Sequence, residues 1–157
     1  MPPVFVILHN VRSIYNVGSI FRTAETIGVT KLYLTGYTPT PVDRFGRKRG
    51  DLSKVALGAE DSVPWEYFKN LDDLVVRFKK DGVHVVAVEQ SSDAHDYKSF
   101  RLGKPTAFIF GNETDGLSKK ELVLCDACIA VPMAGKKESL NVSVCAGIVL
   151  YHVLDVS

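Results

Sequence analysis

The chain has 157 residues, of which 46% are hydrophobic. It is therefore long enough for one domain that buries roughly two-thirds of the surface of its unfolded chain. Its net charge of +1 excludes a polycation, so any binding of nucleic acid needs a local positive patch. No apolar run approaches the roughly 20 residues that span a bilayer, and the first residues lack the basic start of a secretory signal. We expect a cytoplasmic protein with no membrane partner.

The first part of the chain predicts a strand, a helix and a second strand. A continuous apolar run over 4–8 is short enough for a buried strand. Apolar residues then recur at helical spacing over 17–27, with Asn16 as the expected N-cap and Gly28 as the end of the helix. The next strand is expected over 32–34.

The segment 35–58 differs from its neighbours because it combines prolines and glycines with positive charge. Four of its cations lie close together in the sequence: Arg44, Arg47, Lys48 and Arg49. Two interpretations are open. The segment is either a solvated surface loop or a mobile arm that grips the phosphates of RNA and supplies the local patch.

The second half of the chain alternates strands and helices. Strands are expected over 83–88, 106–110 and 128–131, and helices over 71–78, after the capping box Ser118-x-x-Glu121, and after the cap Asn141. One face of the last helix is expected to carry Val144, Cys145, Ile148, Val149 and His152. The alternation predicts an α/β fold whose mostly parallel sheet is covered by helices on both faces.

The three cysteines are an odd number in a chain without an export signal, so reduced thiols are expected. Cys125 and Cys128 have the C-x-x-C spacing of some metal and redox sites. No second pair accompanies them, so we interpret them as packing residues and expect no metal.

Two of the expected strands end in loops of small and polar residues. One loop reads Gly-Asn-Glu-Thr-Asp-Gly over 111–116, and the other follows 128–131 and ends on Ser139 and Asn141. Two such strand ends make a good floor for a bound small molecule. The dinucleotide fingerprint, the P-loop and the nucleophile elbow are absent from the sequence.

Five polar residues near loop ends are candidates for chemistry: Asn16, Arg22, Glu113, Ser139 and Asn141. Taken singly, each has a simple structural explanation. The asparagines can cap helices, Arg22 can pair with Glu25 on the surface, and Glu113 can be a solvated turn residue. Their meaning depends on whether they belong together.

Three stretches of the sequence join these residues. They are 16–24 (NVGSIFRTA), 110–117 (FGNETDGL) and 131–143 (VPMAGKKESLNVS). In this order they resemble the three signature motifs of the SpoU (TrmH-like) RNA 2'-O-ribose methyltransferases, which belong to the SPOUT class. The resemblance covers nearly the whole chain, and Ser19 stands where alanine is frequent in the family.

The resemblance implies a fold, a cofactor and partners. The C-terminal part of the α/β domain would form a deep trefoil knot, an exception to the rule that chains do not thread loops. S-adenosylmethionine would bind in the knot, and the active unit would be a homodimer. The chain would be a single SPOUT domain over 1–157 without an appended RNA-binding domain. Its compact size favours tRNA slightly over rRNA as the substrate.

The resemblance also assigns roles to positions that match the motifs. Arg22 matches the family's catalytic arginine, and its supporting polar residues match Asn16, Glu113, Ser139 and Asn141. The cofactor would meet backbone groups of Gly111, Val131 and Leu140, with Met133 nearby and the loop at Val88–Gln90 closing over the adenosine. RNA contacts are expected from the cations of 44–49.

Methyl transfer from a sulfonium is an in-line displacement, so the protein has to orient a ribose hydroxyl and stabilise its developing charge. Arg22 suits that role because a guanidinium stays charged and is a poor base. Phosphate or water would then accept the proton. Two other interpretations stay open: a knotted RNA-binding module without catalysis, and a doubly wound nucleotide-binding protein of unrelated function.

Overall fold

The computed structural model describes residues 1–155. They form a seven-stranded sheet with the strand order β3-β2-β1-β6-β4-β7-β5, and each pair of neighbouring strands is parallel. The strands are β1 Val4–His9, β2 Lys31–Thr35, β3 Trp65–Phe68, β4 His84–Val88, β5 His95–Asp96, β6 Thr106–Phe110 and β7 Ala127–Ala130. The expected parallel sheet is confirmed.

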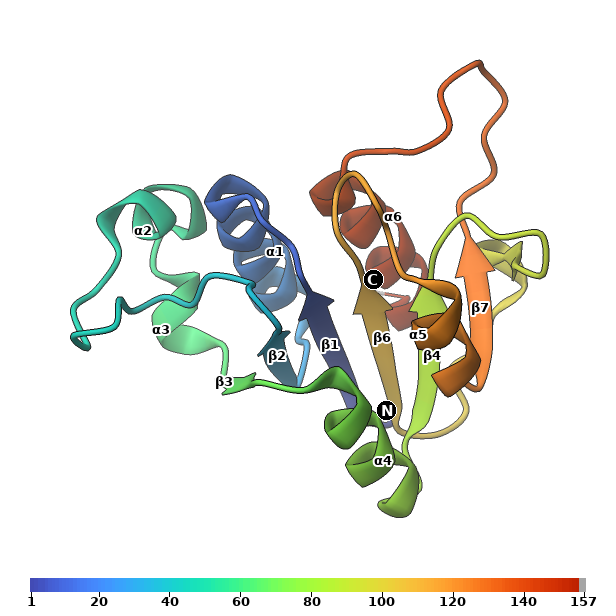
Figure 1. Cartoon of the computed structure of the whole chain (residues 1–157), viewed down its shortest axis with the longest axis horizontal. Helices are drawn as coiled ribbons and strands as arrows, with labels where there is room; N and C mark the ends of the chain where they lie inside the picture. Colours follow the sequence, from blue (N-terminus) through green and yellow to red (C-terminus); the bar gives the residue numbers. More distant parts are fainter. Residues whose placement is uncertain (156–157) are drawn as a thin grey trace.

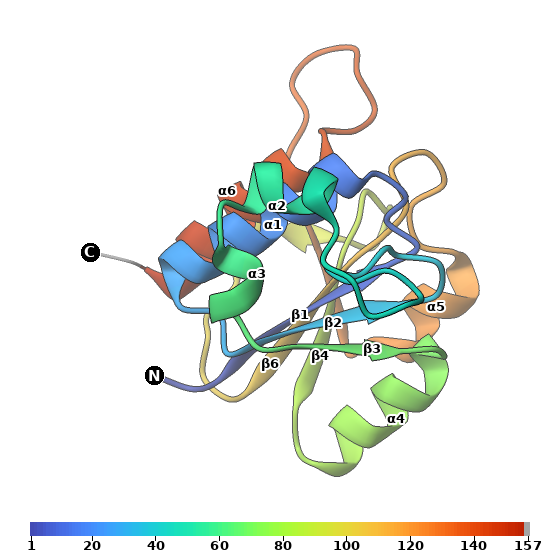
Figure 2. The same ribbon diagram turned by 90° about the vertical axis from the view of Figure 1, so that its left-hand side faces the viewer.

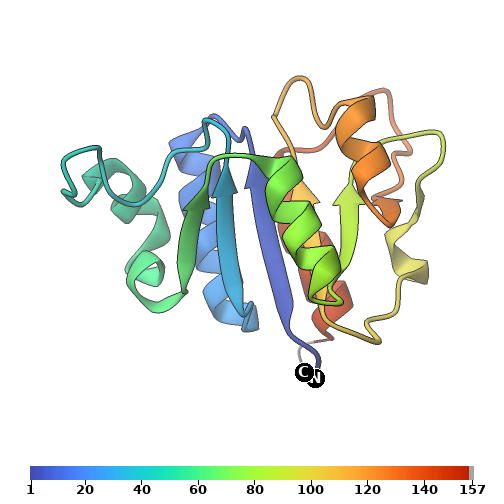
Figure 3. The same cartoon turned by 60° about the horizontal axis from the view of Figure 1, so that its bottom comes forward.

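Helices cover both faces of this sheet. They are α1 Ile14–Ile27, α2 Gly50–Ala56, α3 Ala59–Ser62, α4 Leu71–Lys80, α5 Lys119–Leu124 and α6 Val142–Leu154, with a 3₁₀ turn at Tyr97–Ser99. Figures 1 and 2 show α1, α2, α3 and α6 on one face and α4 and α5 on the other. Figure 3 shows α4 lying across the front of the sheet. The expected cover on both faces is confirmed.

The sheet separates two hydrophobic clusters. Leu8 and Phe110 point into the cluster beneath α1 and α6, while their strand neighbours Ile7 and Ile109 point into the cluster beneath α4. Successive residues of a strand face opposite sides of the sheet. Because both sides are covered, the interior positions of the central strands β1, β4 and β6 are all apolar, which is why these strands were visible in the sequence as continuous apolar runs.

The start of α1 differs from the prediction. Ser13, not Asn16, is the N-cap, and its hydroxyl accepts a hydrogen bond from the Asn16 N–H at 3.2 Å. Both residue types cap helices well, so the sequence does not distinguish them. Asn16 lies inside the first turn with only 5% of its surface exposed, and its side chain is used in another contact described below.

The segment 35–58 is not a loop throughout, because α2 lies inside it and buries Leu52 completely. The face predicted for α6 is also wrong in part. Val144 is 49% exposed and His152 is exposed, whereas Leu150 is fully buried. α6 is apolar on nearly every side, so its periodicity does not indicate which side packs.

The helices of residues 1–155 are all too short or too polar to cross a membrane. α1 has 14 residues, for example, against the roughly 20 that a bilayer requires. The expectation of a cytoplasmic protein stays a prediction.

Candidate active site

A cavity of about 280 Å³ lies at the carboxyl edge of the sheet, where β4, β6 and β7 end. Parallel strands bring their carboxyl ends to one edge, which is where α/β sheets bind ligands. The lining comes from the loops after these strands and from the start of α6: Val88, Glu89, Gln90, Phe110, Gly111, Asn112, Glu113, Thr114, Asp115, Gly116, Ala130, Val131, Glu138, Ser139, Leu140, Val142 and Cys145.

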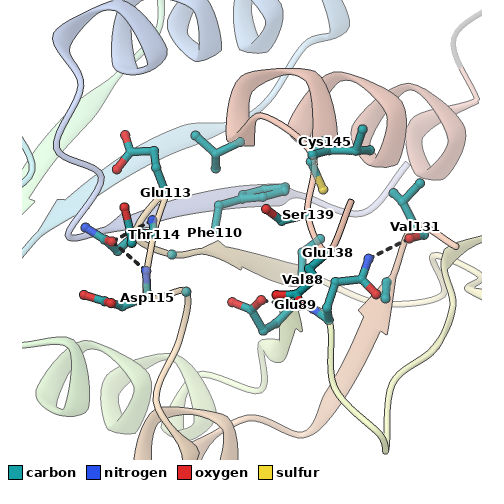
Figure 4. A pocket seen from close by; sticks show the side chains of 17 residues that line it. Val88, Glu89, Phe110, Glu113, Thr114, Asp115, Val131, Glu138, Ser139 and Cys145 are labelled. Atoms are coloured by element: carbon teal, nitrogen blue, oxygen red, sulfur yellow. Dashed lines mark hydrogen bonds between the residues drawn. The ribbon is translucent and has the colours of Figure 1, made fainter. Parts of the chain in front are cut away.

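The lining combines apolar side chains with carboxylates. Figure 4 shows Glu113 and Val131 at opposite ends of the pocket, with Phe110 and Ser139 between them. An apolar floor suits a flat aromatic ring, and nearby carboxylates suit a cationic group. The cavity volume of about 280 Å³ lies near the lower end of the range for small-molecule sites, which is roughly 300–1,000 Å³. S-adenosylmethionine carries both an adenine ring and a positive sulfonium, so these residues fit it.

Four of the five residues expected at the cofactor lie in this lining: Gly111, Val131, Leu140 and Val88. The fifth, Met133, is half-buried in the loop after β7 and is not among the lining residues. The structure therefore brings the two loops singled out in the sequence to one cavity. Direct contact of any of these residues with a cofactor stays a prediction.

Glycines at both ends allow the 111–116 loop to fold back on itself. A Cβ atom on Gly111 would lie 2.8 Å from the carbonyl carbon of Gly116 and 2.9 Å from the side chain of Leu117. Gly116 has a φ of +63°, and the carboxylate of Glu89 lies against its Cα. Side chains larger than hydrogen would open this loop.

Glu89 organises the loop after β4, a role that the sequence did not indicate. Its carboxylate accepts hydrogen bonds from the N–H groups of Leu117 at 2.8 Å and Gln90 at 3.0 Å. The Gln90 side-chain amide donates to the carbonyl oxygen of Val131 at 2.7 Å (Figure 4). These contacts connect the loops after β4, β6 and β7.

Three of the five catalytic candidates form one hydrogen-bonded chain. The Asn16 Nδ2 group donates to Glu113 Oε1 at 3.0 Å, and Asn141 Nδ2 donates to Asn16 Oδ1 at 3.2 Å. Asn141 also caps α6, because its Oδ1 accepts from the N–H groups of Ser143 and Val144. These hydrogen bonds therefore join the 111–116 loop, α1 and α6, which are remote in sequence.

Glu113 is held as a carboxylate. Burial raises its pKa, but the donors from Ser13, Arg12 and Asn16 outweigh burial and hold the pKa below the ordinary 4.5. The N–H groups of Arg12 and Ser13 donate at 3.0 Å each, directly before α1. The negative charge therefore lies at the N-terminus of α1, where the helix dipole favours it.

The other two catalytic candidates lie apart from this chain of hydrogen bonds. Ser139 is exposed and lines the pocket from the loop before α6. Arg22 is exposed on α1 and lines a different hollow of about 460 Å³, beside Leu57 and Ser62 of the α2–α3 region. Within one chain, the structure does not bring Arg22 to the pocket.

The four cations expected at RNA lie in a short hairpin formed by residues 41–49. Its arms are joined by an antiparallel bridge between Val42 and Lys48. Lys48 pairs with Asp61 at 2.9 Å and with the buried Glu60 at 3.3 Å. Arg47 pairs with Asp43 at 3.1 Å. The loop is ordered by these contacts, which speaks against a mobile arm, while contact with RNA stays a prediction.

The cysteines are neutral thiols in this fold. Burial raises the pKa of Cys145, which lines the pocket, to about 11 and that of Cys125 to about 12. Cys128 lies against the carbonyl oxygen of Glu89 at 3.5 Å. Over residues 1–155, no group of three histidine, cysteine or acidic side chains is arranged to hold a metal ion.

Comparison with known proteins identifies the family. Residues 3–151 match the model of the SpoU rRNA Methylase family. The tRNA (guanosine(18)-2'-O)-methyltransferase of Thermus thermophilus is 35% identical, over 96% of this chain and 74% of that protein. The 23S rRNA (guanosine-2'-O-)-methyltransferase RlmB of Neisseria meningitidis is 33% identical, over 95% of this chain but only 57% of that protein.

A solved structure agrees in fold. The AdoMet-bound rRNA methyltransferase of Sinorhizobium meliloti superimposes with a TM-score of 0.84 at 28% identity, over 96% of this chain and 55% of that one. The chain thus spans a little over half the length of some of the proteins that it resembles. Because the family model matches nearly all of its residues, the chain belongs to the SpoU rRNA Methylase family.

Proposed function

We propose that this protein transfers the methyl group of S-adenosylmethionine to a ribose 2'-hydroxyl of RNA. The observation that carries the proposal is the hydrogen-bonded chain of Glu113, Asn16 and Asn141 at the rim of the pocket. It unites one residue from each of the three motif stretches. The family match and the similarity to named 2'-O-methyltransferases give the same reaction class.

The pocket residues would hold the cofactor, which supplies the methyl group as an electrophile when bound. The apolar side chains of Val88, Val131 and Leu140 would pack against its adenosine, and Gly111 would leave its backbone open to close approach. Met133 would join them from the loop after β7. Glu89 and Glu113 would favour its positive charge.

The chemistry follows from the charges at the rim. The ribose oxygen forms a bond to the methyl carbon, the carbon–sulfur bond breaks, and the sulfur keeps the electron pair. Glu113 is a weak base because its pKa is lowered and its oxygens already accept three N–H donors. It would position α1 and Asn16, while Asn141 and Ser139 would shape the loop before α6. The hydroxyl proton would pass to phosphate or water.

Arg22 would stabilise the negative charge that develops on the ribose oxygen and grip the adjacent phosphate. Since Arg22 lies outside the pocket of its own chain, we propose that a homodimer supplies it from the second copy. α6 exposes Val144 and Tyr151, which are 49% and 46% exposed, as apolar surface for such an interface. The trefoil knot, formed by the C-terminal loops around the pocket, belongs to the same proposal.

We propose tRNA in preference to rRNA as the substrate. The whole of 1–157 would act as one catalytic domain. Named relatives act on each class: the Thermus protein on tRNA and the Neisseria protein on 23S rRNA. RNA would reach the pocket across the carboxyl edge of the sheet, where the cations of 44–49 also lie. Methyl transfer to purified tRNA and to rRNA fragments would separate the two.

The decisive experiment is calorimetric titration with S-adenosylmethionine and its demethylated product, with NAD as a control. We expect binding of the first two at about one per chain, and no binding of NAD. Methyl transfer to RNA is then measured with the labelled cofactor. Cofactor binding without methyl transfer to any RNA would contradict the proposed enzymatic activity. RNA binding without cofactor binding would indicate a non-catalytic RNA-binding module.

A further inference from the structure

The tip of the 41–49 hairpin carries an aromatic ring that the fold does not use. Phe45 is 65% exposed, which makes it the most exposed phenylalanine among residues 1–155. The guanidinium carbons of Arg44 and Arg47 lie 4.8 and 5.0 Å from the centre of its ring. This exposed ring lies close to two cations and belongs to neither hydrophobic cluster of the domain.

The hairpin is built to hold that ring outward. The Asp43 N–H donates to the Arg47 carbonyl at 2.8 Å, and the Arg49 N–H donates to the Pro41 carbonyl at 2.9 Å. The Asp43 carboxylate accepts the N–H groups of Phe45 and Arg47 at 2.8 and 3.0 Å. The turn is therefore fixed by the backbone before any ligand arrives, which lowers the entropic cost of binding.

The chain that leads from β2 into the hairpin contacts the pocket through Asn112, one of the lining residues. The Asn112 side chain, beside Glu113, donates to the Tyr37 hydroxyl at 2.8 Å and to the Asn10 carbonyl at 3.0 Å. Figure 3 shows the loops after β2 and after β6 at the same edge of the sheet. A polymer that enters the pocket across this edge would pass the hairpin.

We propose that Phe45 is a stacking platform for an unpaired base of the substrate RNA, with Arg44 and Arg47 placed to contact the adjoining phosphates. The inference rests on the proposed function, and it adds a recognition residue away from the methylated ribose. Exposed aromatics that alternate with cations are the usual device for binding single-stranded nucleic acid, since every base offers a π-face. The positive charge beside the ring favours RNA over an apolar protein surface.

The test compares Phe45→Ala and Phe45→Trp with the wild-type protein by fluorescence anisotropy. The probes are a labelled RNA stem-loop and a fully paired RNA duplex of the same length. We expect Phe45→Ala to weaken binding of the stem-loop about tenfold, to leave the duplex nearly unchanged, and Phe45→Trp to retain affinity. Val76→Ala, which truncates a 60% exposed residue on the opposite face, is the control.

A spectroscopic readout makes stacking directly visible. The chain has one tryptophan, Trp65 of β3, so Phe45→Trp in a Trp65→Phe background reports from the hairpin alone. We expect the stem-loop, but not the duplex, to quench this tryptophan. Unchanged affinity of Phe45→Ala, equal losses for both probes, or a shift in oligomeric state on gel filtration would overturn the proposal. Cofactor titration of Phe45→Ala should match the wild type. If neither protein bound the cofactor, the result would contradict the proposed methyltransferase activity and not the proposed stacking role of Phe45.

Discussion

The pocket rim and the 41–49 hairpin lie at the same edge of the sheet but are organised by opposite means. At the rim, Glu113, Asn16 and Asn141 satisfy one another across three distant segments, and Asn16 is only 5% exposed. In the hairpin, short-range contacts order the turn and leave Phe45 and its flanking cations in solvent. Shielded contacts respond weakly to salt, whereas exposed charges are screened.

The difference teaches that shape and charge are supplied by separate parts of this small domain. The rim fixes the geometry of a cavity, and the hairpin exposes positive charge and an aromatic ring to solvent. Damage at the rim should affect folding and cofactor binding together. Damage at the exposed tip of the hairpin, at Arg44 or Phe45, should affect RNA binding alone.

The largest effect is expected at Arg22, which belongs to neither region in its own chain. Arg22→Ala should lower methyl transfer by about 100- to 1,000-fold, the usual loss when one charge-stabilising donor is removed. Cofactor affinity should stay the same, because Arg22 does not line the pocket of its own chain and, from the second copy, would contact the RNA and not the cofactor. Single-turnover assays with labelled cofactor, together with calorimetry, measure both quantities.

Glu25→Ala is the matched control, since Glu25 lies on the same helix and beside the same hollow as Arg22. Full activity of Arg22→Ala would remove this residue from the mechanism. Mixing Arg22→Ala with a pocket-disabled Gly111→Val chain tests the homodimer. Activity restored by mixing supports an arginine from the second copy, and inactive mixtures oppose it.

The next effect concerns the rim. Glu113→Gln replaces one acceptor oxygen with a donor that faces the N–H groups of Arg12, Ser13 or Asn16, so it should destabilise the fold by about 1 kcal/mol at neutral pH. Because folding lowers the pKa of Glu113 below the ordinary 4.5, its stabilising contribution is present above that value. The contribution is lost as the pH falls through the folded-state pKa.

Urea denaturation at a series of pH values therefore gives a distinct signature. The difference in unfolding free energy between the wild type and Glu113→Gln should shrink as the pH falls below 4.5. Asp115→Asn is the control, because the Asp115 side chain makes no hydrogen bond to α1 within residues 1–155. A difference that stays constant with pH would show that the carboxylate charge is irrelevant to stability.

Much of this fold was predictable because its central strands are buried on both faces. β6 was expected over 106–110 and lies at Thr106–Phe110, and the capping box of Ser118 and Glu121 is present. The edge strands β3 and β5 were missed. They are short, and their positions are half-buried or exposed, so they lack the continuous apolar run that marks the interior.

The site was predictable to a lesser degree. The two polar loops meet at one cavity, as expected from the rule that parallel strands end at one edge. The use of Asn16 as a link and not a cap, and the organising role of Glu89, depend on contacts between segments remote in sequence. No local pattern encodes such contacts. The same holds for the distance of Arg22 from the pocket, which only the packing of α1 determines.

The smallest effects are expected within the hairpin. They test most directly whether its exposed cations, unlike the rim residues, contact RNA. Arg44→Gln should weaken RNA binding modestly and reduce the slope of log affinity against log salt by roughly 0.7–0.9, as for one lost phosphate contact. Arg44 makes no ion pair in the part of the chain that the structure describes. Lys48→Gln should behave differently, because Lys48 is paired with Glu60 and Asp61.

Lys48→Gln would leave the buried carboxylate of Glu60, 4% exposed, without its cation. We therefore expect it to lower the free energy of unfolding while changing the salt slope less than Arg44→Gln does. Lys80→Gln on α4, on the opposite face of the sheet, should change neither quantity. Equal salt slopes for Arg44→Gln and Lys80→Gln would show that the hairpin does not bind RNA and is only a solvated surface loop. Equal slopes for Arg44→Gln and Lys48→Gln would instead show that RNA displaces the internal ion pairs, so that the hairpin rearranges when it binds.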